Sequence, residues 1–257
     1  MKKNKCWVVK IGSALLTNNG KGIDKDLISE WVEQIVELKS HNIDIVLVSS
    51  GSIVEGMKRL GWKDKPSDIH KLQAAAAVGQ MGLVQAYEYL FAKHKVQTAQ
   101  VLLTQDNLIN TKHFENISAT LENLLEFGAV PVINENDTVA TEEIKFGDND
   151  TLAALVANLL DAERLIILTD QHGVFDDDPR INKNASLIKE INFDDEKLER
   201  VAGKTGGTLG SGGMYSKVMA AKQAAKSKTF STIAWGREEK VLIRIYQGEQ
   251  IGTLVHC

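Results

Sequence analysis

Short runs that are apolar throughout alternate along this chain with longer segments that are apolar on one side only. Residues 45–48 (IVLV) and 165–168 (LIIL) contain no polar side chain, which is typical of strands in a parallel sheet covered on both faces. Segment 24–40 instead spaces its apolar residues three or four apart, which is the helical period. This alternation predicts right-handed crossovers and a three-layer α/β/α fold around an open, mainly parallel sheet.

The same pattern extends over the whole chain. We expect strands at 6–11, 43–49, 96–103, 129–133, 165–169 and 229–234, and helices at 24–40, 68–94, 112–127, 151–160 and 214–226. The three prolines are scattered and no linker composition divides the chain. We therefore expect one domain over residues 1–257, with an N-terminal part of about 1–160 and a C-terminal part of about 161–257.

Composition narrows the setting. The 43% hydrophobic and 25% charged shares are those of a soluble globular protein. A net charge of −4, from 30 basic and 34 acidic residues, argues against a nucleic acid or a membrane surface as the main partner. No apolar run approaches the roughly 18 residues of a membrane span, and Cys6 and Cys257 lack metal-ligand spacing. We expect a cytoplasmic protein.

A glycine-rich segment, 209–217, leads directly into the helix-forming run 218–225. Glycines leave backbone amides unshielded, and a helix N-terminus attracts anions, above all phosphates. Lys217 falls in the first turn of that helix, so the segment predicts a phosphate site. A surface loop whose glycines only cap and turn is the alternative. The common nucleotide-binding loop is excluded, because Leu198 stands where the first glycine before Gly203-Lys204-Thr205 would be.

The ends of the first two strands carry further candidates, because ligands of open α/β sheets bind beyond the carboxyl ends of strands. Lys10 lies in an otherwise apolar strand that ends just before Gly12, and a buried lysine is costly unless it is paired. Ser50 and Gly51 follow the second strand and suit close approach by a charged ligand. The alternatives are a solvent-facing Lys10 and a tight turn with a serine cap.

The fourth and fifth strands are followed by polar side chains. Asn134, Asp137, Asp148, Asn149 and Asp150 bracket one loop. A helix cap, worth about 1 kcal/mol, needs only one of them, so the surplus favours a functional site. Thr169 and Asp170 end the fifth strand, and we interpret most of the acidic run 176–178 as a solvated turn.

Six ordered segments carry a family resemblance: 10–13 (KIGS), 49–51 (SSG), 134–137 (NEND), 146–150 (FGDND), 169–170 with 178–180 (TD, DPR), and 211–217 (SGGMYSK). From about residue 5 to its C-terminus the chain resembles the amino-acid kinase family (carbamate kinase-like fold), and specifically the glutamate 5-kinases within it. Ser216 stands where threonine is common in that family. We expect no C-terminal RNA-binding-type (PUA) domain, which many bacterial members carry.

The resemblance implies a reaction and its partners. The γ-phosphoryl group of ATP would pass to the side-chain carboxylate of L-glutamate, giving L-glutamyl 5-phosphate, the first step of proline biosynthesis. Mg²⁺ would accompany ATP, proline would act as a feedback inhibitor, and the enzyme would be a homo-oligomer. Segment 68–94 could be a subunit interface or an ordinary core-facing helix.

The resemblance also assigns roles to residues. Lys10 and Lys217 would contact the transferring phosphate from opposite sides, and Asp150 would orient both of them. The backbone amides of Gly12, Ser50 and Gly51 would add neutral donors to the phosphate. The N-terminal part would bind the amino acid and the C-terminal part the nucleotide. The substrate residues would be Ser50, Gly51, Asn134, Asp137, Asp148 and Asn149. The nucleotide residues would be Lys10, Gly12, Thr169, Asp170, Ser211, Gly212, Gly213, Met214, Tyr215, Ser216 and Lys217.

Rival functions remain open at this point. An N-acetylated substrate has no ammonium for Asp137, and uridine monophosphate would need extra cations near Ser50 or Asn134. Aspartate differs from glutamate by one methylene, worth only about 1–3 kcal/mol, so an aspartate kinase is not excluded. A catalytically silent amino-acid or nucleotide sensor could use the same scaffold, but the presence of both lysines favours an enzyme.

Overall fold

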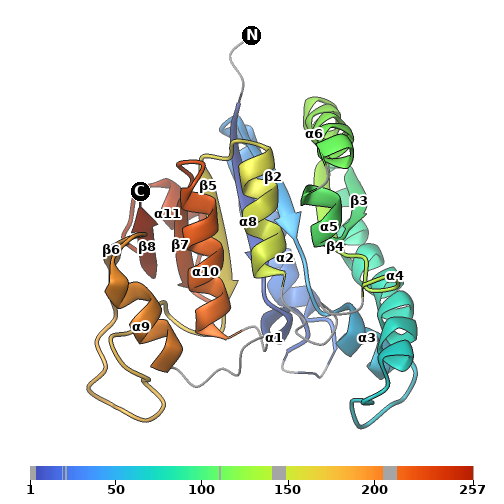
Figure 1. Ribbon diagram of the computed structural model, residues 1–257. Helices are drawn as coiled ribbons and strands as arrows, with labels where there is room; N and C mark the ends of the chain where they lie inside the picture. Colours follow the sequence, from blue (N-terminus) through green and yellow to red (C-terminus); the bar gives the residue numbers. More distant parts are fainter. Residues whose placement is uncertain are drawn as a thin grey trace.

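One eight-stranded sheet forms the middle of the molecule in a computed structural model that describes residues 4–18, 20, 22–109, 111–140, 149–204 and 213–256. The strand order is β3-β4-β2-β1-β5-β7-β8-β6 (Figure 1). The strands are β1 (Lys5–Ile11), β2 (Ile43–Val48), β3 (Thr98–Leu103), β4 (Val130–Glu135), β5 (Arg164–Thr169), β6 (Glu190–Asn192), β7 (Phe230–Trp235) and β8 (Thr253–His256). Neighbouring strands are parallel except β7 and β8, which pair antiparallel.

Helices cover both faces of this sheet. The described helices are α1 (Ser13–Leu16), α2 (Lys25–Ser40), α3 (Ser52–Arg59), α4 (Ile69–Ala92), α5 (Gln105–Ile109), α6 (Thr111–Glu126), α8 (Asp150–Leu159), α9 (Glu196–Lys204), α10 (Met214–Ala225) and α11 (Val241–Tyr246). Buried residues of α5, α6, α8, α9 and α10 join one apolar core, and those of α1, α2, α4 and α11 join the other. The predicted three-layer fold is confirmed.

The six strands and five helices predicted from the sequence are all present, with ends shifted by at most two residues. The pattern did not indicate β6 or β8, which have only three and four residues and are too short for a periodic signal. It also missed α1, α3, α5 and α11, helices of four to eight residues. The nine-residue α9 was not among the five predicted helices either, although the charged run 194–201 that overlaps it has a helix-like pattern.

The central place of β1 positions the site. β1 pairs with β2 on one side and with β5 on the other, so Lys10 lies in the middle of the sheet near its carboxyl edge. Helices α8 and α10 pack side by side over one face of the sheet (Figure 1). Helix α4 belongs to the core on the opposite face. Helix α3 packs closely on α4, because glycines at 56 and 79 let the two backbones touch.

None of the described helices is both long and apolar enough to cross a membrane.

Candidate active site

Two lysines meet one buried carboxylate at the carboxyl edge of the sheet. Lys10 comes from β1, Asp150 opens α8, and Lys217 lies in the first turn of α10. The Nζ atom of Lys10 is 2.5 Å from Oδ1 of Asp150, and the Nζ atom of Lys217 is 3.0 Å from Oδ2. Asp150 is fully buried, and the lysine side chains are 4% and 6% exposed. The solvent-facing alternative for Lys10 is therefore wrong, and the three predicted catalytic residues are together.

The charge balance of this group favours an anion. Asp150 brings one negative charge and the two lysines bring two positive charges, all of them buried. Asp150 also begins a helix, where the helix dipole stabilises its negative charge. The formal charges of Lys10, Asp150 and Lys217, which we call the triad, sum to +1, which suits an anionic ligand.

The first turn of α10 also contacts Asp150. The hydroxyl of Ser216 is a hydrogen-bond donor that lies 2.9 Å from Asp150 Oδ2 and 2.8 Å from the Gly213 carbonyl oxygen. Gly213 is the N-cap and brings no side-chain acceptor to the first-turn amides, which suits an anion at this terminus. Met214 is buried and Tyr215 half-buried. The predicted Ser211 and Gly212 lie outside the described residues, as does Asp148.

An amide network lies beside the triad. Asn149 directs its Nδ2 to the Ser49 carbonyl oxygen (2.5 Å), to Asn134 Oδ1 (2.6 Å) and to Ser50 Oγ (3.3 Å). These bonds join the end of β2, the end of β4 and the start of α8. Three predicted substrate residues, Ser50, Asn134 and Asn149, are therefore in direct contact.

Asp137 lies next to the same loop. Its Oδ2 accepts a hydrogen bond of 2.7 Å from the hydroxyl of Ser52, the first residue of α3. Burial raises the pKa of Asp137 above its usual 3.8, and the Ser52 hydrogen bond partly opposes this. Gly51 takes φ +91° just before α3, a left-handed conformation that favours glycine. The structure thus explains Gly51 as a backbone requirement of the turn that carries Ser50 and Ser52.

Gly12 is placed differently from expectation. Its backbone N–H, predicted to donate to phosphate, donates to the Leu168 carbonyl oxygen at 3.2 Å. Gly12 therefore ties the end of β1 to β5. We conclude that it shapes the turn after Lys10 with its amide already bonded.

The predicted nucleotide residues of the C-terminal part lie at the end of β5. Thr169 is buried and donates its hydroxyl to Asp170 at 3.1 Å, and its carbonyl oxygen accepts from Gly236 after β7. Most of the acidic run 176–178 was interpreted as a solvated turn, but Asp178 is buried. Arg180 donates to both of its oxygens and holds the pKa of Asp178 below its usual range.

Sequence reasoning missed three residues that support this site. Ser52 bonds Asp137, Tyr87 shares a 3.2 Å hydrogen bond with the Ser49 hydroxyl, and Gln80 accepts from Asn134 Nδ2 at 2.7 Å. A signal for Gln80 was present, because it is a polar residue on the helical face that also carries buried Ala76 and Leu83.

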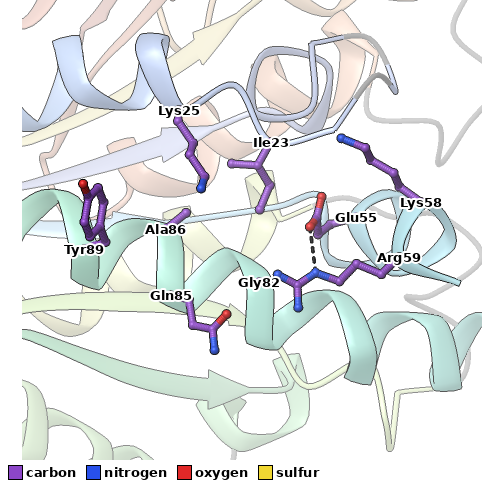
Figure 2. A pocket seen from close by; sticks show the side chains of 9 residues that line it. All are labelled: Ile23, Lys25, Glu55, Lys58, Arg59, Gly82, Gln85, Ala86 and Tyr89. Carbon is purple, nitrogen blue, oxygen red and sulfur yellow. Dashed lines mark hydrogen bonds and ion pairs between the residues drawn. The ribbon is translucent and has the colours of Figure 1, made fainter.

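A cavity of about 440 Å³ lies elsewhere, between the start of α2 and helices α3 and α4. Figure 2 shows the Glu55–Arg59 ion pair and the other lining residues, which include Lys25 and Lys58. The Arg59 guanidinium lies against Gly82, where a Cβ atom would approach it to 2.3 Å. None of the predicted site residues lines this cavity, so we do not assign it to the reaction.

Comparisons with known proteins identify the relatives of this chain. Residues 5–233 match the Amino acid kinase family. Glutamate 5-kinase of Hydrogenovibrio crunogenus is 59% identical over 253 residues, which are 98% of this chain and 67% of that protein. Glutamate 5-kinase of Pseudomonas syringae pv. tomato is 58% identical over 249 residues, 97% of this chain and 67% of that protein.

A solved structure supports the same fold. Carbamate kinase from Giardia lamblia bound to AMP-PNP superposes with a TM-score of 0.70 at 13% identity, covering 100% of this chain and 99% of that one. The chain spans about two thirds of the length of the two curated relatives above. With its fold, its ordered motifs and its sequence matches in agreement, the chain belongs to the amino acid kinase family.

Proposed function

We propose that this protein is a glutamate 5-kinase, which transfers the γ-phosphoryl group of ATP to the side-chain carboxylate of L-glutamate. The observation that carries the proposal is the triad, two buried lysines on one carboxylate beside a network of substrate-type amides. High identity to curated glutamate 5-kinases over nearly the whole chain supports this substrate above the alternatives. The product, L-glutamyl 5-phosphate, begins proline biosynthesis.

Phosphoryl transfer requires correctly positioned reactants and positive charge near the transferring group. The glutamate side chain is already ionised at pH 7, so its oxygen can attack the γ-phosphorus without a general base. A new bond forms between carboxylate oxygen and phosphorus, and the bond to the ADP oxygen breaks. Lys10 and Lys217 would stabilise the negative charge on the transferring and leaving oxygens, and Asp150 would keep both ammonium groups in place.

We assign the amino acid to the N-terminal part, residues 1–160. Asp137 would accept from the α-ammonium group of glutamate, while Ser50, Asn134 and Asn149 would orient the rest of the molecule. Gly51 would hold the turn, and Asp148 completes the set proposed from the motifs. The contacts among Ser50, Asn134 and Asn149 support this assignment.

We assign the nucleotide to the C-terminal part, residues 161–257. Thr169 and Asp170 would lie along it, and the amides of Gly213, Met214, Tyr215 and Ser216 would face its phosphates. Ser211 and Gly212 are proposed from the motif alone. The AMP-PNP bound to the similar carbamate kinase supports nucleotide binding by this fold.

Mg²⁺ is proposed to enter with ATP. Among the described residues, no group of three His, Cys, Asp or Glu side chains gathers as a metal site. The hard oxygens that Mg²⁺ prefers would come mainly from the phosphates and from water. No step of the transfer is assigned to the ion.

We also propose that the protein is a homo-oligomer in the cytoplasm and that proline inhibits it by feedback. Support for self-association comes from α4, where Val78, Met81 and Tyr89 are 36%, 58% and 61% exposed. Sedimentation of the purified chain tests self-association, and the glutamate-dependent reaction rate measured with and without proline tests the feedback inhibition.

The decisive experiment traps the acyl phosphate. The chain is incubated with ATP, Mg²⁺ and hydroxylamine, and separately with glutamate, aspartate, N-acetylglutamate or carbamate. We expect hydroxamate with glutamate and none with N-acetylglutamate or carbamate. Preference for aspartate would make the chain an aspartate kinase, and no product with any of the four would favour the sensor.

A further inference from the structure

The amide of Asn134 is held in one orientation from two directions. Its Oδ1 accepts from Asn149 Nδ2 at 2.6 Å and from the Glu135 backbone N–H at 2.9 Å. Its Nδ2 donates to Gln80 Oε1 at 2.7 Å. Rotation of this amide by 180° would place its oxygen against the Gln80 oxygen and its NH₂ group against two donors.

The orientation of Gln80 follows from the same bond. Because Oε1 faces Asn134, Nε2 must point the other way. In the described part of the chain this Nε2 is buried and makes no hydrogen bond, and Gln80 as a whole is 9% exposed. A buried donor without an acceptor costs folding free energy, so packing alone does not account for a glutamine at this position.

Beside Gln80, helix α4 also contacts the start of α3, which follows the turn that carries Ser50. Gly79, the neighbour of Gln80, touches the start of α3 so closely that a Cβ atom would lie 1.8 Å from the Ser52 carbonyl oxygen. At this level α4 therefore contacts both the start of α3, through Gly79, and the end of β4, through Gln80.

We propose that Gln80 is a positioning residue of the amino-acid site, whose Oε1 holds Asn134 so that its second N–H is presented to a carboxylate oxygen of the substrate. Asn134 Nδ2 has two hydrogens, and Gln80 takes only one of them. With the amide reversed, an oxygen would face the substrate carboxylate and repel it. This inference rests on the proposed glutamate site.

The test compares Gln80→Met with Gln85→Met, a matched change on the same helix at an exposed position. Methionine fills the volume but cannot accept from Asn134. For Gln80→Met we expect KM for glutamate to rise about tenfold, KM for ATP to stay within about twofold, and the thermal midpoint not to fall. Gln85→Met should leave all three unchanged.

Two further measurements separate positioning from a general structural role. Gln80→Glu keeps an oxygen toward Asn134, and burial should hold the unpaired acid neutral, so KM for glutamate should stay within about threefold of the parent. In an Asn134→Ala background, Gln80→Met should change that KM by less than about twofold, because its effect passes through Asn134.

Three results would overturn the inference. They are an unchanged KM for glutamate in Gln80→Met, a parallel rise of both KM values with a lower thermal midpoint or loss of folding, and the same tenfold effect in the Asn134→Ala background. Failure of the proposed function is distinguishable, because the parent chain itself would then give no glutamate-dependent hydroxamate.

Discussion

Ser52 and Asp137, 85 residues apart in the sequence, are joined by a 2.7 Å hydrogen bond from the serine hydroxyl to the carboxylate. The bond links the first residue of α3 to the loop after β4. It places the acid proposed for the substrate ammonium against the turn that carries Ser50 and Gly51.

Ser52→Ala removes the donor and leaves Asp137 in place. A hydrogen bond of this kind contributes about 0.5–1.5 kcal/mol, so we expect KM for glutamate to rise about 2- to 12-fold with kcat little changed. Steady-state kinetics at fixed saturating ATP provide the measurement. A fall in kcat with constant KM would place Ser52 in the transfer step and not in substrate binding.

Asp137 predicts the pH dependence of substrate binding. Burial raises its folded-state pKa above 3.8, so the carboxylate protonates at a higher pH than an ordinary aspartate does. As pH falls through that raised pKa, KM for glutamate should rise, because the neutral acid no longer attracts an ammonium group. In Asp137→Asn the same acidic step should be missing from the pH profile of KM.

The raised pKa of Asp137 also determines the direction in which folding stability changes with pH. A raised acid pKa favours the folded state fully below 3.8, and this contribution is lost as pH rises through the folded-state pKa. The stability difference between the parent chain and Asp137→Asn should therefore shift in favour of Asp137→Asn as pH rises through this range. Urea unfolding at several pH values measures it, and an opposite slope would contradict the burial of Asp137.

Asp150→Asn should affect both folding and activity. It removes the carboxylate that pairs with both buried ammonium groups, and loss of one member of a buried ion pair costs about 3–5 kcal/mol. Urea unfolding should detect this loss, and ATP should restore part of it by supplying negative charge. Asp161→Asn, at an exposed position after the same helix, serves as the control and should change neither property.

Gly79→Ala tests the close contact between α3 and α4. The new methyl group would lie 1.8 Å from the Ser52 carbonyl oxygen, so α3 must move, at a cost of about 1–3 kcal/mol. We expect lower stability together with a higher KM for glutamate. Gly203→Ala, where a Cβ atom meets nothing within 4 Å, should change neither.

The sequence predicted the sheet and the triad for related reasons. Residues 45–48 of β2 and 165–168 of β5 are all apolar, so the pattern of these strands required no knowledge of partners. Lys10 was conspicuous because a charged residue interrupts such a strand, and the family motifs connected it with Asp150 and Lys217. All three side chains are buried together in the structure.

Contacts that depend on tertiary structure could not be predicted in this way. The amide of Gly12 was expected to bind phosphate, but a strand distant in sequence supplies the Leu168 carbonyl that accepts from it. Asp178 was part of a run interpreted mostly as solvated, yet Arg180 pairs with it and both of its oxygens are bonded. The position of Gln80 on a buried helical face was a signal in the sequence, but its partner, Asn134 on β4, became known only from the structure.

The central claim is that two lysines act on one transferring phosphate, and kcat of Lys10→Met tests it most directly. Lys5→Met is the matched control, because Lys5 lies on the same strand but is 65% exposed and pairs with Glu163. We predict that kcat of Lys10→Met falls about 100-fold or more with the fold intact, while Lys5→Met keeps the parent value. An unchanged kcat in a folded Lys10→Met protein would contradict the account.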